Sequence, residues 1–166
     1  MSVKKFLITF TLVIFCLSAH AVTPRSTGKY KNWESFVVET DKGKICFAQT
    51  TPTKRAPAAV KRDKSKLFVT FRPSEEIKDE VSLTSGHDYK TSSVTASSGK
   101  RRYSFFSQKN FAWLLDDQEE KKFIQLMKKA TDIIVKARTT KGAETTDHYS
   151  MMGFTKAYNT AKKTCS

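Results

Sequence analysis

The amino-acid sequence predicts a mainly β protein, an antiparallel sandwich or barrel that carries two short helices. Short runs of β-branched and aromatic residues recur along most of the chain, and turns rich in Gly, Pro, Asp and Ser separate them at close spacing. Helical periodicity is confined to two segments, one after the middle strands and one near the last residues. The chain shows no internal repeat, no coiled-coil pattern and no glycine-rich phosphate loop.

The N-terminal segment has the organisation of a secretory signal peptide. Lys4 and Lys5 make its start basic, residues 6–17 form an apolar run, and small residues follow. We therefore expect residues 1–21 to be cleaved and the exported chain to begin at Val22. The apolar run is shorter than the roughly 20 residues that span a membrane, and no later segment approaches that length. The expected product is one periplasmic domain, outer-membrane associated or secreted, with no transmembrane segment.

Loss of the signal peptide also removes Cys16 and leaves Cys46 and Cys165. In an exported protein, two cysteines are expected to form one disulfide. Closing a loop of roughly 120 residues stabilises a domain by on the order of 4–5 kcal/mol in the chain-entropy model. The alternatives are a metal site, for which the ligands are too few, and a reactive thiol, which needs an electropositive surrounding.

The first part of the exported chain predicts a hairpin. Residues 22–31 are polar, contain Pro24 and Gly28, and are interpreted as a loose lead-in. Residues 33–39 and 44–49 are two strand-like runs on either side of a Thr-Asp-Lys-Gly turn. Gly43 is expected to take the positive φ that such a turn needs.

Residues 50–66 interrupt the strand pattern and predict a long basic loop. Pro52 and Pro57 disfavour a continuous strand, and the segment carries six cations. They are Lys54, Arg55, Lys61, Arg62, Lys64 and Lys66. A second basic group lies near a later turn and consists of Lys100, Arg101 and Arg102. Clustered positive charge on a loop can bind a polyanion, and the alternative is a solvated loop with no partner.

The middle of the chain predicts further antiparallel strands. The expected strands are 67–73, 79–85, 89–96, 101–107 and 111–114. Pro73 ends the first of these strands, whose alternating residues predict that both of its faces are largely covered. A Ser-Ser-Gly-Lys turn at 97–100 joins the third and the fourth.

The last part predicts two helices around a second hairpin. Asp117 to Glu120 has the form of a capping box, and Phe123, Leu126, Met127 and Ala130 follow at helical spacing. Residues 132–139 and 144–151 are expected to pair as antiparallel strands. Gly153 should end the second strand. A final helix is then expected, capped by Thr155, with Phe154, Tyr158 and Ala161 inward.

The charge of the chain favours anionic partners. After loss of Lys4 and Lys5, 28 basic residues stand against 16 acidic residues, which gives a net charge of +12. The partners that fit an exported protein are anionic lipid, lipopolysaccharide and a polyanion of a host surface, whereas nucleic acid does not fit this compartment. The alternative is that the charge serves only solubility.

No residue pattern in the chain predicts catalysis. The candidate groups are His87-Asp88 and Asp147-His148-Tyr149. Neighbouring residues of a strand point to opposite faces, so His148 cannot pair with Asp147 or Tyr149 on one side. Asp147 is interpreted as an acceptor for backbone or hydroxyl donors, and Tyr149 as core. We expect no catalytic residue, metal or cofactor.

Several motifs resemble the invasion-associated locus B family of alphaproteobacteria. They are Asn32-Trp33-Glu34, Ile45-Cys46-Phe47, the 67–73 strand, Val81-Ser82, and Thr146-Asp147-His148-Tyr149-Ser150-Met151-Met152-Gly153-Phe154 followed by Cys165. The resemblance covers nearly all of residues 22–166, and the single cysteine pair is similar to the shorter branch. It departs from the family at His87, where an aromatic residue is common. It implies an immunoglobulin-like β-sandwich, export, a link to host-cell entry in some pathogenic members, and no established catalytic residues.

Three hypotheses of function follow in order. The first is an exported, non-enzymatic envelope or surface protein that binds an anionic or protein partner and aids interaction with host cells. The second is a structural accessory of the cell envelope that docks to another protein through a sheet edge or an apolar patch. The third is a hydrolase.

Overall fold

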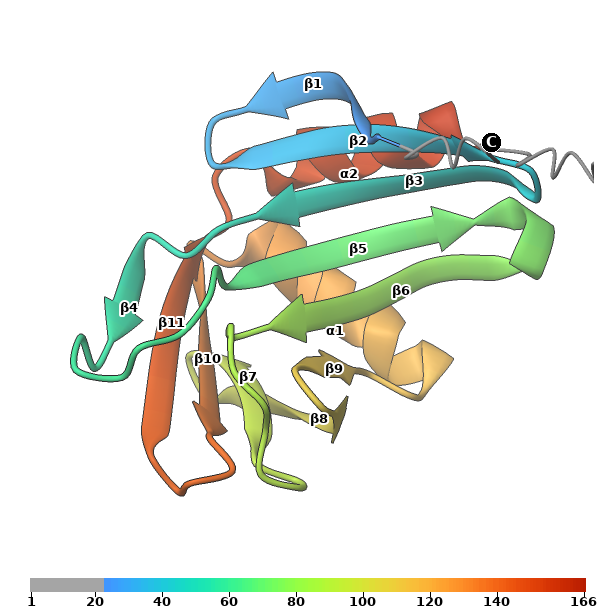
Figure 1. The fold of residues 1–166 in the computed structure, drawn as a ribbon. Coiled ribbons are helices and arrows are strands. Elements are labelled where there is room, and N and C mark those ends of the chain that lie inside the picture. Colours follow the sequence, from blue (N-terminus) through green and yellow to red (C-terminus); the bar gives the residue numbers. More distant parts are fainter. Residues whose placement is uncertain (1–22) are drawn as a thin grey trace, which may run out of the picture.

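The computed structural model describes residues 23–166, so the predicted signal peptide and Cys16 lie outside the described residues. Eleven strands form one antiparallel sheet in the order β1-β2-β3-β5-β6-β9-β8-β7-β10-β11-β4 (Figure 1). The strands are β1 (Arg25–Tyr30), β2 (Trp33–Thr40), β3 (Gly43–Thr50), β4 (Lys54–Ala56), β5 (Lys66–Arg72), β6 (Ile77–Thr84), β7 (Val94–Ser98), β8 (Arg101–Gln108), β9 (Phe111–Trp113), β10 (Asp132–Arg138) and β11 (Glu144–Ser150). The helices are α1 (Asp117–Lys129), α2 (Phe154–Thr164) and a short 3-10 turn, η1 (Pro73–Glu75). Over residues 23–166 the sheet is not closed, because β1 and β4 are its two ends.

The sheet is bent, so that its two halves run in different directions. In Figure 1, β1, β2, β3, β5 and β6 run across the view, whereas β7, β10 and β11 run nearly at right angles to them, with β4 beside β11. The α2 helix lies behind β2 and β3, and α1 lies behind β6. The inward side chains of both halves and of both helices belong to one hydrophobic core. The mainly β class and the two helices are thereby confirmed.

Aromatic side chains hold the helices to the sheet. The Trp33 ring lies 4.8 Å from Phe154 at the start of α2, between ring centroids. The Phe123 ring of α1 lies 5.0 Å from Tyr103 of β8. Each such ring removes about 150–250 Å² of surface from water, so these contacts fix where both helices sit.

The predicted disulfide is confirmed. Cys46 of β3 and Cys165, directly after α2, are bonded with their Cα atoms 5.8 Å apart. Cys46 is fully buried, so the bond ties the C-terminal helix to the inner face of the sheet. The predicted hairpin of β2 and β3 is also confirmed, with Thr40 opposite Gly43 and a φ of 117° at Gly43.

Helix starts differ from the capping predictions. The cap of α1 is Asp116, whose carboxylate accepts the N–H groups of Gln118 and Glu119, so a capping box at Asp117 is wrong. The α2 helix starts after Gly153 without a side-chain cap, so Thr155 does not cap it. Gly153 has a φ of 96°, and a Cβ there would lie 1.8 Å from the Tyr30 carbonyl oxygen. Only glycine fits this corner.

Three predicted segments, a lead-in, a loop and a strand, differ from the structure. The lead-in contains β1, which pairs with β2 although its residues are mostly polar. The basic loop contains β4, which pairs with β11. The strand predicted over 89–96 begins only at Val94. Before it, Tyr89 is buried and forms an isolated β-bridge with Thr139, so this segment does not pair with β8 or β10 as part of β7. Contacts with residues far along the chain decide the boundaries of β4 and β7, whereas β1 is a mostly polar strand that forms a hairpin with the neighbouring β2.

Within residues 23–166, the longest and most apolar helical stretch falls short of what crossing a membrane requires.

Candidate functional site

Strand register brings two of the predicted cations into one row on the outer face of the sheet. Arg102 lies opposite Ser97, Ser97 opposite Ile134, Ile134 opposite His148, and His148 opposite Lys54. Residues that face each other on antiparallel strands point to the same side of a sheet. Lys136 lies on the same outer side, two residues along β10 from Ile134, and is exposed. We call Lys54, Arg102, Lys136 and His148 the basic face.

The remaining predicted cations are placed apart from this face. Lys61, Lys64 and Lys100 are exposed on loops and turns. Lys66 lies on the other half of the sheet, where its Nζ is 3.1 Å from Gln49 Oε1 and 5.8 Å from the centroid of the Phe68 ring. Arg101 lies beside α1 in a shallow hollow with Lys121 and Lys122. The nine predicted residues therefore do not form one continuous surface.

Arg62 is not available to a soluble anion, which corrects its place among the binding candidates. Its side chain is 2% exposed and donates both Nη atoms to the Asp147 carboxylate, at 2.8 and 2.7 Å. It also donates to the Ser85 carbonyl at 3.0 Å. Arg55 approaches the same carboxylate, with Nε 3.9 Å from Oδ1. Asp147 is an acceptor, as predicted, but its donor is a guanidinium, because only a cation offsets the burial of this charge.

The histidine groups considered for catalysis do not meet a free carboxylate. His148 is on the basic face, and the Asp147 carboxylate on the opposite side is held by Arg62. His87 Nε2 lies 2.9 Å from the Thr145 hydroxyl, and its ring packs on Tyr89. Thr145 is only 2% exposed. This arrangement positions a loop against β11.

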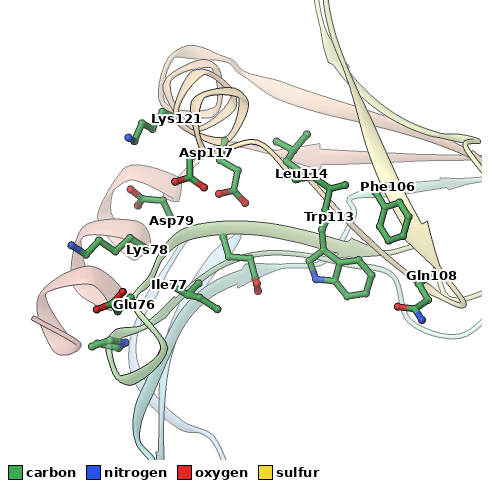
Figure 2. A pocket seen from close by; sticks show the side chains of 14 residues that line it. Glu76, Ile77, Lys78, Asp79, Phe106, Gln108, Trp113, Leu114, Asp117 and Lys121 are labelled. Carbon is green, nitrogen blue, oxygen red and sulfur yellow. The ribbon is translucent and has the colours of Figure 1, made fainter.

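A groove lies between β6 and the start of α1 and extends to β8 and β9 (Figure 2). Its volume is about 1050 Å³. One end is lined by carboxylates, namely Glu76, Asp79, Glu80, Asp117 and Glu120. The other end is apolar and is lined by Phe106, Trp113, Leu114 and Leu115. Figure 2 shows the labelled members of these two sets at opposite sides of the view. We call this the acidic groove, which no sequence pattern predicted.

Glu120 is the least exposed carboxylate of the acidic groove. Only 7% of the residue is exposed, and its Oε1 accepts the backbone N–H of Val81 at 2.9 Å. Burial raises the pKa of Glu120 to about 7, the hydrogen bond from Val81 opposes this, and the charges of Glu80, Asp117 and Asp79 add to it. Glu120 shares the buried stripe of α1 with Phe123, Ile124 and Met127. The helical spacing between Glu120 and these apolar residues is the sequence signal that could have identified Glu120 as buried.

Stability should depend on the charge of Glu120. Its pKa of about 7 in the folded chain exceeds the ordinary value of 4.5, so folding takes up a proton between these values. The associated stability is present below about pH 4.5 and is lost as the pH rises through about 7. Glu120→Gln keeps an acceptor for Val81, and we expect it to stabilise the domain by on the order of 1–2 kcal/mol at about pH 8, because the groove admits water and screens part of the effect.

The measurement is urea unfolding of both proteins at about pH 4 and about pH 8. The two proteins should be equally stable at the lower pH. Glu119→Gln, one position earlier on α1 and more exposed, is the matched control and should give a small effect at either pH. An equal difference between Glu120→Gln and the parent at both pH values would contradict this account.

A row of half-exposed aromatic rings crosses the outer face of the other half of the sheet. Successive ring centroids are 5.2 Å apart from Phe36 to Phe47, 6.2 Å to Phe68, 6.5 Å to Phe111 and 5.9 Å to Trp113. On this outer face of the 67–73 strand Thr70 is buried and Phe68 is partly buried, so both faces of the strand are largely covered, as predicted. Trp113 also lines the acidic groove, so the row ends there.

Among the described residues, no group of three or more histidine, cysteine or acidic side chains is arranged to hold a metal ion. Comparisons of this chain with models of protein families, with curated proteins and with solved structures found no match.

Proposed function

We propose that the chain is an exported, non-enzymatic protein of the invasion-associated locus B type, and that its basic face binds an anionic surface of the cell envelope. The motifs that carry the resemblance make contact with one another, which supports the family assignment. Trp33 Nε1 donates to the Ser150 carbonyl at 2.9 Å, and the Trp33 ring packs on Phe154. Cys46 and Cys165 are bonded to each other.

The immunoglobulin-like sandwich belongs to the same proposal. Its two layers would be the two halves of the bent sheet, one containing β2, β3, β5 and β6 and the other β7, β10 and β11. What supports this is that inward side chains of both halves share one core. In orthogonal sandwiches, layers cross at a steep angle and a strand or bend passes between them.

The observation that carries the proposed function is the row from Arg102 to Lys54. Four strand spacings of about 4.8 Å separate these residues, so the row spans roughly 19 Å. Serine and threonine hydroxyls of Ser97, Thr95 and Thr146 lie on the same side and can donate to phosphate or carboxylate oxygens. Lys54, Arg102 and Lys136 form no ion pair within residues 23–166, so their charge is free for a partner. Repeated anionic headgroups, as in lipopolysaccharide or acidic lipid, fit such a surface.

We expect the triple variant Lys54→Gln, Arg102→Gln and Lys136→Gln to bind acidic lipid vesicles about a hundredfold more weakly. Each cation near an anionic surface contributes about 1 kcal/mol, so three contribute about 3 kcal/mol. Co-sedimentation with phosphatidylglycerol vesicles and with lipopolysaccharide micelles measures the loss for each source of anion. Binding by the parent protein should weaken as salt rises from about 0.1 to about 0.5 M, because screening shortens the range of the charges.

A matched control removes three other cations. Lys129→Gln, Lys156→Gln and Lys163→Gln change the net charge equally, and all three residues are exposed on or beside the helices. If both triple variants lose binding to the same extent, net charge alone attracts the protein and the basic face is not the site. If neither loses binding, the proposal is wrong.

A further inference from the structure

We propose that the acidic groove binds a cationic, partly apolar peptide segment of a partner protein. This inference goes beyond the proposed function, because it concerns a different surface with the opposite charge.

The charge of the groove is opposite to that of the chain. Basic residues outnumber acidic ones by 30 to 16 in the sequence, yet five carboxylates line this groove. Two lysines, Lys78 and Lys121, are also among the lining residues. Glu80 is paired with Arg72, whereas within residues 23–166 neither Glu76 nor Asp117 forms an ion pair. This negative charge is therefore complementary to a cationic partner.

Glu120 gives a second observation that points to a ligand. More than nine-tenths of the residue is buried, and its Oε1 is occupied by the Val81 N–H. Its Oε2 accepts no hydrogen bond from any described residue, although Glu120 lines the groove. Burial and the nearby carboxylates disfavour its charge and raise its pKa. An ammonium or guanidinium group that enters the groove would offset both effects and donate to Oε2, which faces the groove.

The apolar end of the groove decides between a simple cation and a peptide. Phe106 is 52% exposed and Leu115 is 74% exposed, and both line the same end of the groove as Trp113. Contiguous exposed apolar surface of this kind marks interaction sites. The volume of about 1050 Å³ accommodates more than one side chain. A Lys or Arg at the carboxylate end, followed by an apolar residue against Phe106 and Trp113, uses both ends. A metal ion or a lone amine leaves the apolar end uncovered.

The test uses a fluorescent peptide that contains alternating Arg and Leu, measured by anisotropy. One comparison peptide carries Glu in place of Arg, and another carries Ser in place of Leu. We expect the Arg-Leu peptide to bind at least about tenfold more tightly than either, as loss of one end of the site removes a contact worth more than about 1.4 kcal/mol. Affinity should rise from about pH 5 to about pH 8, because Glu120 becomes charged over this range.

Variants place the binding in the groove. Glu76→Gln with Asp117→Asn should weaken binding about tenfold or more. Glu39→Gln with Asp41→Asn is the control of equal charge and should leave binding unchanged. Glu39 is exposed near the end of β2, and Asp41 is exposed in the turn between β2 and β3. Glu120→Gln should remove the rise with pH, and urea unfolding of this variant checks that its fold is intact. The basic-face variant should bind the peptide as the parent does, which separates this test from that of the proposed function.

Three outcomes would overturn the inference. One is equal weakening by the groove variant and the control variant. Another is equal affinity for the Arg-Leu and the Arg-Ser peptides, which would reduce the groove to a general cation site. The third is spermine binding at the groove as tightly as the Arg-Leu peptide does.

Discussion

Arg62→Met should destabilise the domain by about 3–5 kcal/mol, the usual cost of leaving one partner of a buried ion pair without the other. Arg62 donates to the Asp147 carboxylate, the Ser85 carbonyl, the Ala56 carbonyl and the Ser65 hydroxyl. These contacts join the segment after β4 to the end of β6 and to β11. Its loss leaves the Asp147 charge, which is 1% exposed, with only the more distant Arg55.

Urea unfolding with the neighbouring variant Lys61→Met as a control measures this effect. Lys61 is exposed, so the control should change stability by less than about 0.5 kcal/mol. Asp147→Asn should be destabilising as well. The double variant Arg62→Met with Asp147→Leu should lose less than the sum of the two single changes, because it leaves no unpaired charge. A cost for Arg62→Met as small as that for Lys61→Met would show that the buried pair does not hold this segment.

Removing the disulfide should cost about 2–5 kcal/mol. The bond joins residues 119 apart in the sequence, so its loss gives much conformational freedom to the unfolded chain. Cys46→Ala with Cys165→Ala avoids a free thiol. The α2 helix should still dock, because Phe154, Ala157, Tyr158 and Ala161 are buried, but it should open at lower denaturant concentration.

Reductant supplies the control for this prediction. It should lower the unfolding midpoint of the parent protein to that of the double alanine variant, and it should leave the variant unchanged. Mass spectrometry verifies that the bond is reduced. An unchanged midpoint in the verified reduced protein would mean that packing alone fixes α2 to the sheet.

Local patterns explain which elements the sequence predicted. The β2–β3 hairpin depends on a short turn with Gly43, and α1 depends on the helical spacing of its apolar residues. Both can therefore be predicted from the local sequence alone. The disulfide was predicted by a count of cysteines and a compartment argument. β1 and β4 were missed because their residues are mostly polar or charged. Only their pairing with β2 and β11 makes them strands.

The candidate sites depend even more than the elements do on contacts between residues that are far apart in the sequence. Arg62 looked like any other cation of a basic loop, since its partner Asp147 lies 85 residues further along the chain. The basic face depends on the register of four strand pairs, so Lys136 and His148 had no sequence signal that linked them to Lys54. Glu120 did have one, the apolar stripe of α1, but its acidic character favoured interpretation as part of a cap.

The basic face itself is tested most directly by lysine footprinting. The protein is acetylated briefly with and without phosphatidylglycerol vesicles, and each lysine is quantified by mass spectrometry. We predict that vesicles protect Lys54 and Lys136 and leave Lys129 and Lys156 as reactive as in the free protein. Protection spread evenly over all four, or strongest on Lys129 and Lys156, would contradict the proposed function.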